Sequence, residues 1–140
     1  MSDLSLFFAG NAAAPETEDF VVSERFKDKE GKPIPWQIKG ITEEENDAIR
    51  ASATRKVKAK NGQMIPETNT GEYLAKLASA CVVYPNLNDA ELQKSYGVRG
   101  ADAAIKKMLL TGEYATLIGK IQEINGFDKD INDLVDEVKN

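Results

Sequence analysis

The chain has 140 residues, of which 41% are hydrophobic and 29% are charged. These values are typical of one soluble globular domain, and they exclude a membrane protein or a chain disordered by composition. Eighteen Lys and Arg against 23 Asp and Glu give a net charge of −5, which argues against general attraction to nucleic acids or anionic membranes.

Histidine is absent from the chain, and Cys81 is its single cysteine. Histidine-based catalysis, histidine-containing metal sites and intramolecular disulfides are therefore excluded. A lone cysteine is compatible with a reducing compartment. Because the N-terminus lacks a basic region and no apolar run reaches membrane-spanning length, we expect the protein to stay in the cytoplasm where it is made.

Residues 1–19 are predicted to be a flexible N-terminal segment with a short apolar patch. The patch comprises Leu4, Leu6, Phe7 and Phe8. Small residues, Pro15 and an acidic run follow it, which is typical of a linker. Docking of the patch onto the core and recognition of a partner protein both remain open.

Residues 20–39 carry the alternating pattern of a β-hairpin. Apolar residues alternate with polar ones around Trp36, and the polar stretch 28–32 contains the glycine that a hairpin loop favours. Neither Pro33 nor Pro35 can donate a backbone hydrogen bond, so we expect the second strand to lie at an edge of the sheet.

A helix is predicted from about residue 43 to Asn61-Gly62, because Thr42 and Glu45 form a capping box. Its second half, residues 50–60, carries five positive charges and no negative one. Three interpretations remain: a solvated helix end whose cations complement the helix dipole, a contact for an acidic partner, or a nucleic-acid site. The last is disfavoured because no aromatic residue lies there.

Apolar periodicity predicts further helices at about 71–84, 89–96, 101–110 and 113–125. Cys81 falls in an apolar stripe, which indicates a buried structural thiol. Residues 128–139 form an amphipathic C-terminal helix, for packing on its own core or on another protein; its stripe contains Ile131, Leu134, Val135 and Val138. The predicted fold is mainly α, of the α+β class: four to six short helices packed as one domain over residues 20–140, with an N-terminal β-hairpin.

The sequence contains no constellation typical of an enzyme. The turn at 97–100 lacks the spacing of a phosphate-binding loop, and residues 128–132 lack the glycine of a calcium loop. Acidic residues cluster at helix starts, where helix capping and solvation explain them. We therefore predict no catalytic, cofactor-binding or metal-binding residues, and the profile favours a binding or assembly protein.

Four segments carry a family resemblance, and they occur in a specific order: PWQIKGITEEE at 35–45, PNLNDAELQKSYGV at 85–98, MLLTGEY at 108–114 and EINGF at 123–127. In these segments the chain resembles phage tail assembly chaperones of the XkdN-like type. The resemblance covers about Phe20 to Asn140, so the N-terminal patch is expected to lie outside it.

The resemblance implies a non-enzymatic protein of long-tailed phages and prophages, made in the host cell and absent from the finished virion. Such chaperones bind the tape measure protein, keep it soluble and bring tail tube subunits to it. In related systems a frameshifted longer form contacts the tube protein. Covering exposed apolar helix stripes until the tube closes around them would prevent aggregation of the tape measure protein.

We hypothesise that partner contacts use the apolar residues of both ends and the basic residues between them. These are Leu4, Leu6, Phe7, Phe8, Leu134, Val135 and Val138, with Arg55, Lys56, Lys58 and Lys60 steering acidic stretches of the partner. No cofactor, nucleic acid or membrane is expected as a partner, and self-association stays open. The alternative is a small nucleic-acid-binding regulator that uses the basic helix 50–60.

Overall fold

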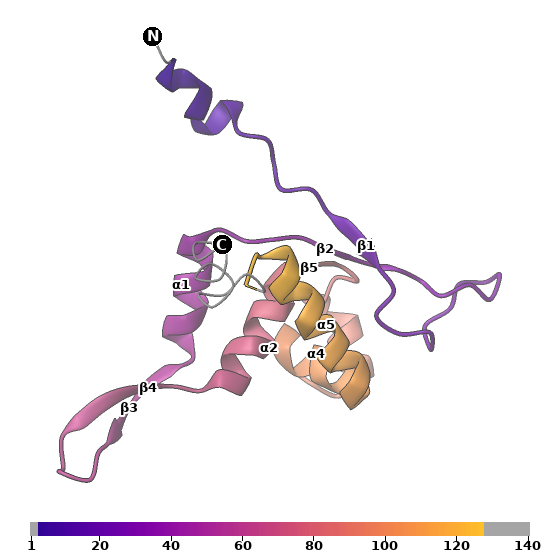
Figure 1. Ribbon diagram of the computed structural model, residues 1–140. Helices are drawn as coiled ribbons and strands as arrows, with labels where there is room; N and C mark the ends of the chain where they lie inside the picture. Colours follow the sequence, from indigo (N-terminus) through magenta and orange to yellow (C-terminus); the bar gives the residue numbers. More distant parts are fainter. Residues whose placement is uncertain (1–2, 128–140) are drawn as a thin grey trace, which may run out of the picture.

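The computed structural model describes residues 3–127 of the chain. Five α-helices and five short β-strands lie in this range. The helices and a small sheet form one body, from which the N-terminal segment and a β-hairpin protrude in different directions (Figure 1). The expected fold class, mainly α within the α+β class with an N-terminal strand pair, is confirmed.

The body contains a three-stranded antiparallel sheet of order β1-β2-β5. Its strands are β1 (Glu18–Phe20), β2 (Trp36–Ile38) and β5 (Val82–Tyr84). Glu18 pairs with Ile38 across β1 and β2, and Ile38 pairs with Val82 across β2 and β5. β2 is therefore the central strand, and it carries Trp36 and Ile38 into the core.

Two expectations for this region are corrected. The predicted strand pair exists, but the first strand covers Glu18–Phe20 and does not extend towards Phe26. β2 does not lie at a sheet edge, because the strand begins at Trp36, after both prolines, and its ladder needs no donor from either of them.

α1 (Glu43–Ser52) begins with the predicted capping box, in which the Thr42 hydroxyl accepts a hydrogen bond from the Glu45 N–H. The helix does not continue to residue 61. Residues 54–58 form β3 (Thr54–Lys58), which pairs antiparallel with β4 (Met64–Thr68). The basic helix 50–60 is thus a wrong prediction, because most of this stretch is a strand of a hairpin.

Four helices complete the body: α2 (Thr70–Cys81), α3 (Ala90–Ser95), α4 (Ala101–Met108) and α5 (Thr111–Ile124). Three of these match the predicted ranges closely. α2 ends earlier than predicted, since Val82–Tyr84 pairs with β2 as a strand. The predicted helix at 128–139 lies outside the described residues.

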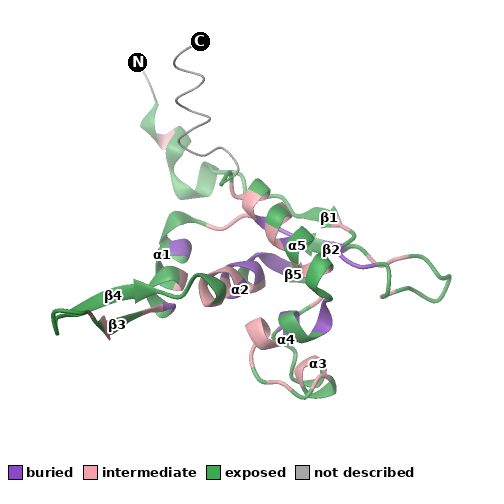
Figure 2. Cartoon of the chain, turned by 60° about the horizontal axis from the view of Figure 1, so that its bottom comes forward, coloured by how far each residue is buried: buried purple, intermediate pink, exposed green. Residues whose placement is uncertain are grey.

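The core lies where α2 packs against α4, α5 and the sheet. Its fully buried side chains include Leu77, Cys81, Ile105, Leu117 and Ile121, which come from α2, α4 and α5. Figure 2 shows the buried residues concentrated in the body, whereas the hairpin and the N-terminal segment are coloured almost entirely as exposed. Both protruding segments therefore contribute little to the core.

Candidate partner-binding surfaces

The N-terminal residues form two short 3₁₀ turns, η1 (Leu4–Phe7) and η2 (Ala9–Asn11). The Asp3 carboxylate accepts hydrogen bonds from the N–H and the hydroxyl of Ser5, and these bonds lower the pKa of Asp3. The local capping explains why the segment starts with a turn, although no core packs against it.

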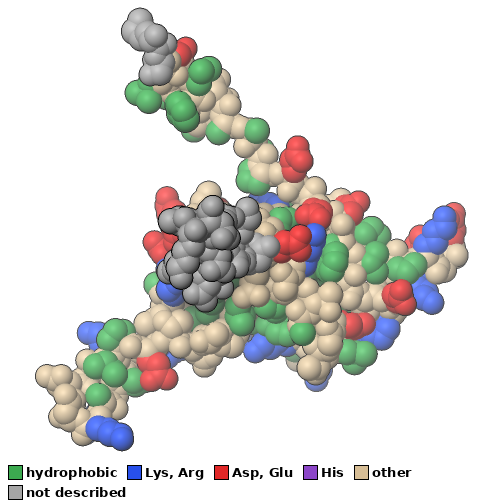
Figure 3. Space-filling view, viewed as in Figure 1, with side chains coloured by type: hydrophobic (Ala, Val, Ile, Leu, Met, Phe, Trp, Pro, Cys, Tyr) green, Lys and Arg blue, Asp and Glu red, His purple; other side chains and the backbone are tan. Residues whose placement is uncertain are grey.

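We call residues 3–11 the N-terminal arm. Its four large apolar side chains are 58–80% exposed: Leu4, Leu6, Phe7 and Phe8. In Figure 3 they form a hydrophobic cluster that stands apart from the body. In this structure the patch therefore does not dock onto the core. A cluster of this kind has a large unfavourable contact with water, which burial against another molecule would remove.

The four basic residues predicted as a steering surface lie on the β3–β4 hairpin or in its turn. Arg55, Lys56 and Lys58 belong to β3, and Lys60 lies in the turn. They do not share one face. Side chains alternate along a strand, so Arg55 points to one face of the hairpin and both strand lysines point to the other.

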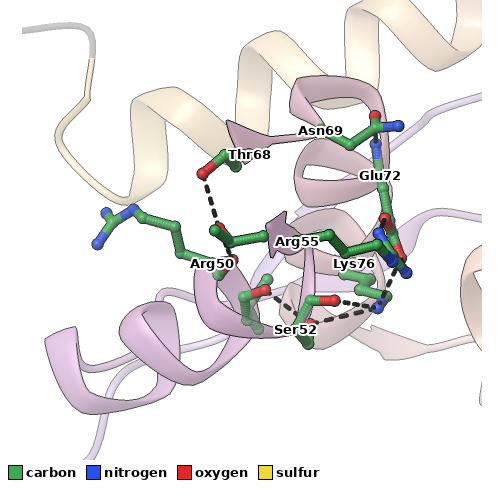
Figure 4. A network of polar contacts seen from close by, with 9 residues as sticks. Arg50, Ser52, Arg55, Thr68, Asn69, Glu72 and Lys76 are labelled. Atoms are coloured by element: carbon green, nitrogen blue, oxygen red, sulfur yellow. Dashed lines mark hydrogen bonds and ion pairs between the residues drawn. The ribbon is translucent and has the colours of Figure 1, made fainter. Parts of the chain in front are cut away.

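A polar network fixes the base of the hairpin to α2 (Figure 4). The Arg55 guanidinium binds the Glu72 carboxylate through two contacts, of 2.6 and 3.0 Å. Lys76 Nζ lies 3.0 Å from the same carboxylate and 3.2 Å from Ser52 Oγ. Hydrogen bonds from Arg55, and then from Lys76, lower the pKa of Glu72 to about 2.

The two strands are also joined at their base by their threonines. Thr54 and Thr68 share a hydrogen bond of 2.7 Å between their hydroxyl oxygens. The charge of Arg55 is thus used within the molecule, whereas the lysines at 56, 58 and 60 form no ion pair with any residue of the described range.

The hairpin also exposes apolar side chains that the sequence reasoning did not select. Met64 and Ile65 are 58% and 44% exposed on β4. The sequence contains a signal for this hairpin: Asn61-Gly62 follows the alternating stretch 56–60, and an Asn-Gly pair favours a hairpin turn. Gly62 adopts φ +85°, a left-handed conformation that favours glycine. The predicted helix end at Asn61-Gly62 is therefore wrong, because this pair forms the hairpin turn.

A small apolar pocket of about 190 Å³ opens on the body, between the sheet and α3. Trp36, Tyr84 and Tyr96 contribute to its lining. Pockets for cofactors and drug-sized ligands usually measure several hundred Å³, so this one suits a single apolar side chain.

The C-terminal stripe with Leu134, Val135 and Val138 lies outside the described residues. Over residues 3–127, no three cysteine or acidic side chains converge in a way that could hold a metal ion. No helix in that range has both the length and the apolar content needed to cross a membrane.

The fold and its surfaces define a small α+β protein in which two protruding segments expose apolar side chains, and one of them, the β3–β4 hairpin, also exposes lysines. A family model described as Phage XkdN-like tail assembly chaperone protein, TAC, matches residues 4–139, and the chain belongs to this family. The match begins at Leu4 and so includes the N-terminal patch, which corrects the expectation that the patch lies outside the family resemblance.

Two curated relatives come from Bacillus subtilis (strain 168). "Uncharacterized protein YqbN" is 35% identical over 139 residues, which are 99% of this chain and 93% of that protein. "Phage-like element PBSX protein XkdN" is 32% identical over 139 residues, covering 99% and 94%. A crystal structure of the protein YqbN matches with a TM-score of 0.75 and 30% identity, covering 90% of this chain and 98% of that chain.

Proposed function

We propose that this protein binds the tape measure protein of its phage or prophage tail, keeps it soluble and helps to recruit tail tube subunits. Membership of the tail assembly chaperone family supports a role in tail assembly. The observation that carries it is the N-terminal arm, whose apolar side chains are 58–80% exposed. A surface of this kind fits a partner that itself exposes apolar helix faces.

The proposal assigns the chain a binding role and no reaction. Because the arm is joined to the body by an extended linker, it can reach along a long partner while the folded body remains in water. The hairpin lysines add a local positive charge to a chain of net charge −5, which favours acidic stretches of the partner.

The test is co-expression of this chain with the tape measure protein encoded beside it. We expect the long protein to become soluble and to co-purify with several copies of the chain. A tape measure protein that stays insoluble, or that is soluble without this chain bound, would contradict the proposal.

A matched pair of variants tests the arm. Replacing Leu6, Phe7 and Phe8 together by serine should reduce co-purification strongly, because each buried apolar side chain contributes about 1.5–3 kcal/mol. Replacing Ala12, Ala13 and Ala14 by serine, in the linker that follows the arm, should leave co-purification unchanged. Equal binding by the two triple variants would show that the arm is not the contact.

Two parts of the proposal need separate measurements: the recruitment of tail tube subunits, and whether the chain acts in the cytoplasm or stays in the particle. Addition of the tail tube protein to the purified complex should give a ternary complex, either with this chain or with a longer frameshifted form. The chain should act in the host cytoplasm and be lost before the particle is complete. Mass spectrometry of purified particles that detected it in stoichiometric amounts would contradict this part of the proposal.

A further inference from the structure

The backbone hydrogen bonds of the β3–β4 hairpin follow a simple alternation. The Ala59 N–H donates to the Gln63 carbonyl at 2.8 Å, and at the other end the Asn69 N–H donates to the Ala53 carbonyl at 2.8 Å. In an antiparallel pair, hydrogen-bonded and non-hydrogen-bonded residue pairs alternate. Odd-numbered residues therefore bond within the hairpin, and even-numbered residues direct their backbone groups to its outer edges.

The two outer edges differ in the backbone hydrogen-bond donors that they present. On β4 the central even-numbered residue is Pro66, which has no N–H, so this edge lacks a donor in its middle. On β3, Lys56 and Lys58 each direct an N–H and a carbonyl outward, and within the described part of the chain these groups have no backbone partner. The β3 edge is therefore the one able to accept a further strand.

Charge decides what kind of strand this edge can accept. Lys56 and Lys58 are both exposed and two residues apart, so their side chains lie on the same face of the hairpin. Edge lysines oppose pairing with apolar or basic strands, because the charge would be desolvated or repelled. Carboxylates on an incoming strand would pair with them instead. On the opposite face, Val57 is half-buried and offers an apolar contact between the lysines.

We propose that the outer edge of β3 binds an extended acidic segment of a partner protein as a third strand. Acidic side chains at alternate positions face Lys56 and Lys58, and a β-branched residue between them lies beside Val57. The proposal rests on the function proposed above, in which the hairpin is a partner-binding surface, and it adds the chemistry and register of the bound segment.

The probe is a short synthetic peptide that alternates Glu with Val and ends in Thr, added to the full-length protein at low ionic strength. Amide hydrogen exchange should show new protection at Lys56 and Lys58, whereas the Val57 amide, already bonded within the hairpin, should change little. A peptide of the same residues, with its two glutamates placed side by side, should bind about two- to threefold more weakly, because only one of them can then face a lysine.

Three variants separate strand addition from simple charge attraction. Lys58→Pro removes the outward N–H and the charge without removing a bond of the hairpin ladder, and we expect it to weaken peptide binding about tenfold or more. Lys58→Thr removes the same charge but keeps the N–H, so a loss of only about two- to threefold is expected. Met64→Pro makes the matched change on the other edge, directly opposite Lys58, and should leave affinity unchanged.

The hairpin amides of Ala59 and Asn69 report whether each variant keeps the hairpin. Equal losses in Lys58→Pro and Lys58→Thr would overturn strand addition, as would absence of peptide binding or an equal loss in Met64→Pro. Protection of the same amides that rises with protein concentration alone would assign the edge to a second copy of the chain, and tighter binding of a DNA duplex would assign it to phosphates. Either outcome overturns the proposal.

Two measurements on the wild-type chain distinguish this proposal from the proposed function. A wild-type chain that binds the peptide in the alternating register but leaves the tape measure protein insoluble supports strand addition and contradicts the function alone. A wild-type chain that keeps the tape measure protein soluble but shows no protection at Lys56 and Lys58 with the peptide overturns strand addition and leaves the function intact.

Discussion

The guanidinium of Arg25 binds the carboxylate of Glu113 through Nη2 at 2.7 Å and Nε at 3.2 Å, which ties the segment after β1 to the first turn of α5. The same carboxylate also accepts the Leu110 N–H at 2.8 Å. Hydrogen bonds from Arg25, then Ser23 and then the Leu110 N–H lower the pKa of Glu113 to about 2. One side chain thus caps α5 and connects it to the N-terminal part of the body.

This contact predicts a loss of stability in acid. The folded-state pKa of Glu113, about 2, lies below the ordinary value of 4.5. The stabilisation is therefore fully present above about pH 4.5 and is lost as the pH falls towards 2. Glu113→Gln should lower the melting temperature at neutral pH and flatten its dependence on pH within this window.

Thermal unfolding measured across that pH range checks the prediction. Glu91→Gln is the control, because Glu91 lies in the first turn of α3 and forms no ion pair with any residue of the described range. It should retain the acid-dependent loss of the unaltered protein. Glu72, whose pKa is also about 2, should supply part of the slope that remains in Glu113→Gln.

Core packing predicts different costs for two leucines of the same region. Leu117 of α5 is fully buried, whereas Leu110, just before α5, is 59% exposed. Leu117→Ala should lower the free energy of unfolding by about 2–5 kcal/mol, since it removes buried apolar atoms and leaves a cavity. Leu110→Ala should change it by less than about 0.5 kcal/mol. Denaturant unfolding gives both values, and equal costs would contradict the packing described here.

The start of α1 predicts a capping effect. The Thr42 hydroxyl accepts the Glu45 N–H at 3.2 Å, so Thr42→Ala should cost about 1 kcal/mol of unfolding free energy. Thr116 lies inside α5 and its hydroxyl donates to the Gly112 carbonyl. Thr116→Ala should be neutral or slightly stabilising, because alanine favours a helix interior. Denaturant unfolding measures both changes. Equal unfolding free energies for Thr42→Ala and Thr116→Ala would contradict a stabilising cap.

The buried thiol predicts slow chemistry in the folded state. Cys81, the last residue of α2, is fully buried in the core. This burial raises the pKa of its thiol. At about pH 8 the folded protein should therefore resist alkylation, since the thiolate is the reactive form. One thiol per chain should react quickly in denaturant, and Leu117→Ala should accelerate the reaction by making opening more frequent. Rapid labelling of the unaltered folded protein would contradict burial of Cys81.

The helices of the body could be predicted from the sequence because their information is local. Apolar residues at helical spacing mark α4 and α5, and Thr42 with Glu45 marks the start of α1. The apolar character of the N-terminal arm was equally plain from Leu4 to Phe8. Its exposure was not, because whether an apolar segment docks on its own core depends on surfaces distant in the sequence.

The hairpin was missed because helix and strand preferences compete in residues 50–60. Arginine and lysine favour a helix weakly, but pairing with residues 64–68 outweighs that preference. The same competition moved Val82–Tyr84 from the predicted end of α2 into the sheet, where β2 supplies the partner strand. The consequence for the candidate surface is direct: a helix would have spread its lysines around an axis, whereas the strand puts Lys56 and Lys58 on one face.

By itself, the sequence determined the α+β class, the approximate positions of the body helices and the family, since periodicity, caps and ordered motifs are properties of neighbouring residues. Only the tertiary structure decided which strands pair, and that the arm stands clear of the core. It also decided that Arg55 binds Glu72, whereas Lys56 and Lys58 form no ion pair within residues 3–127. These features depend on contacts between residues far apart in the chain, whose free energies no local pattern contains.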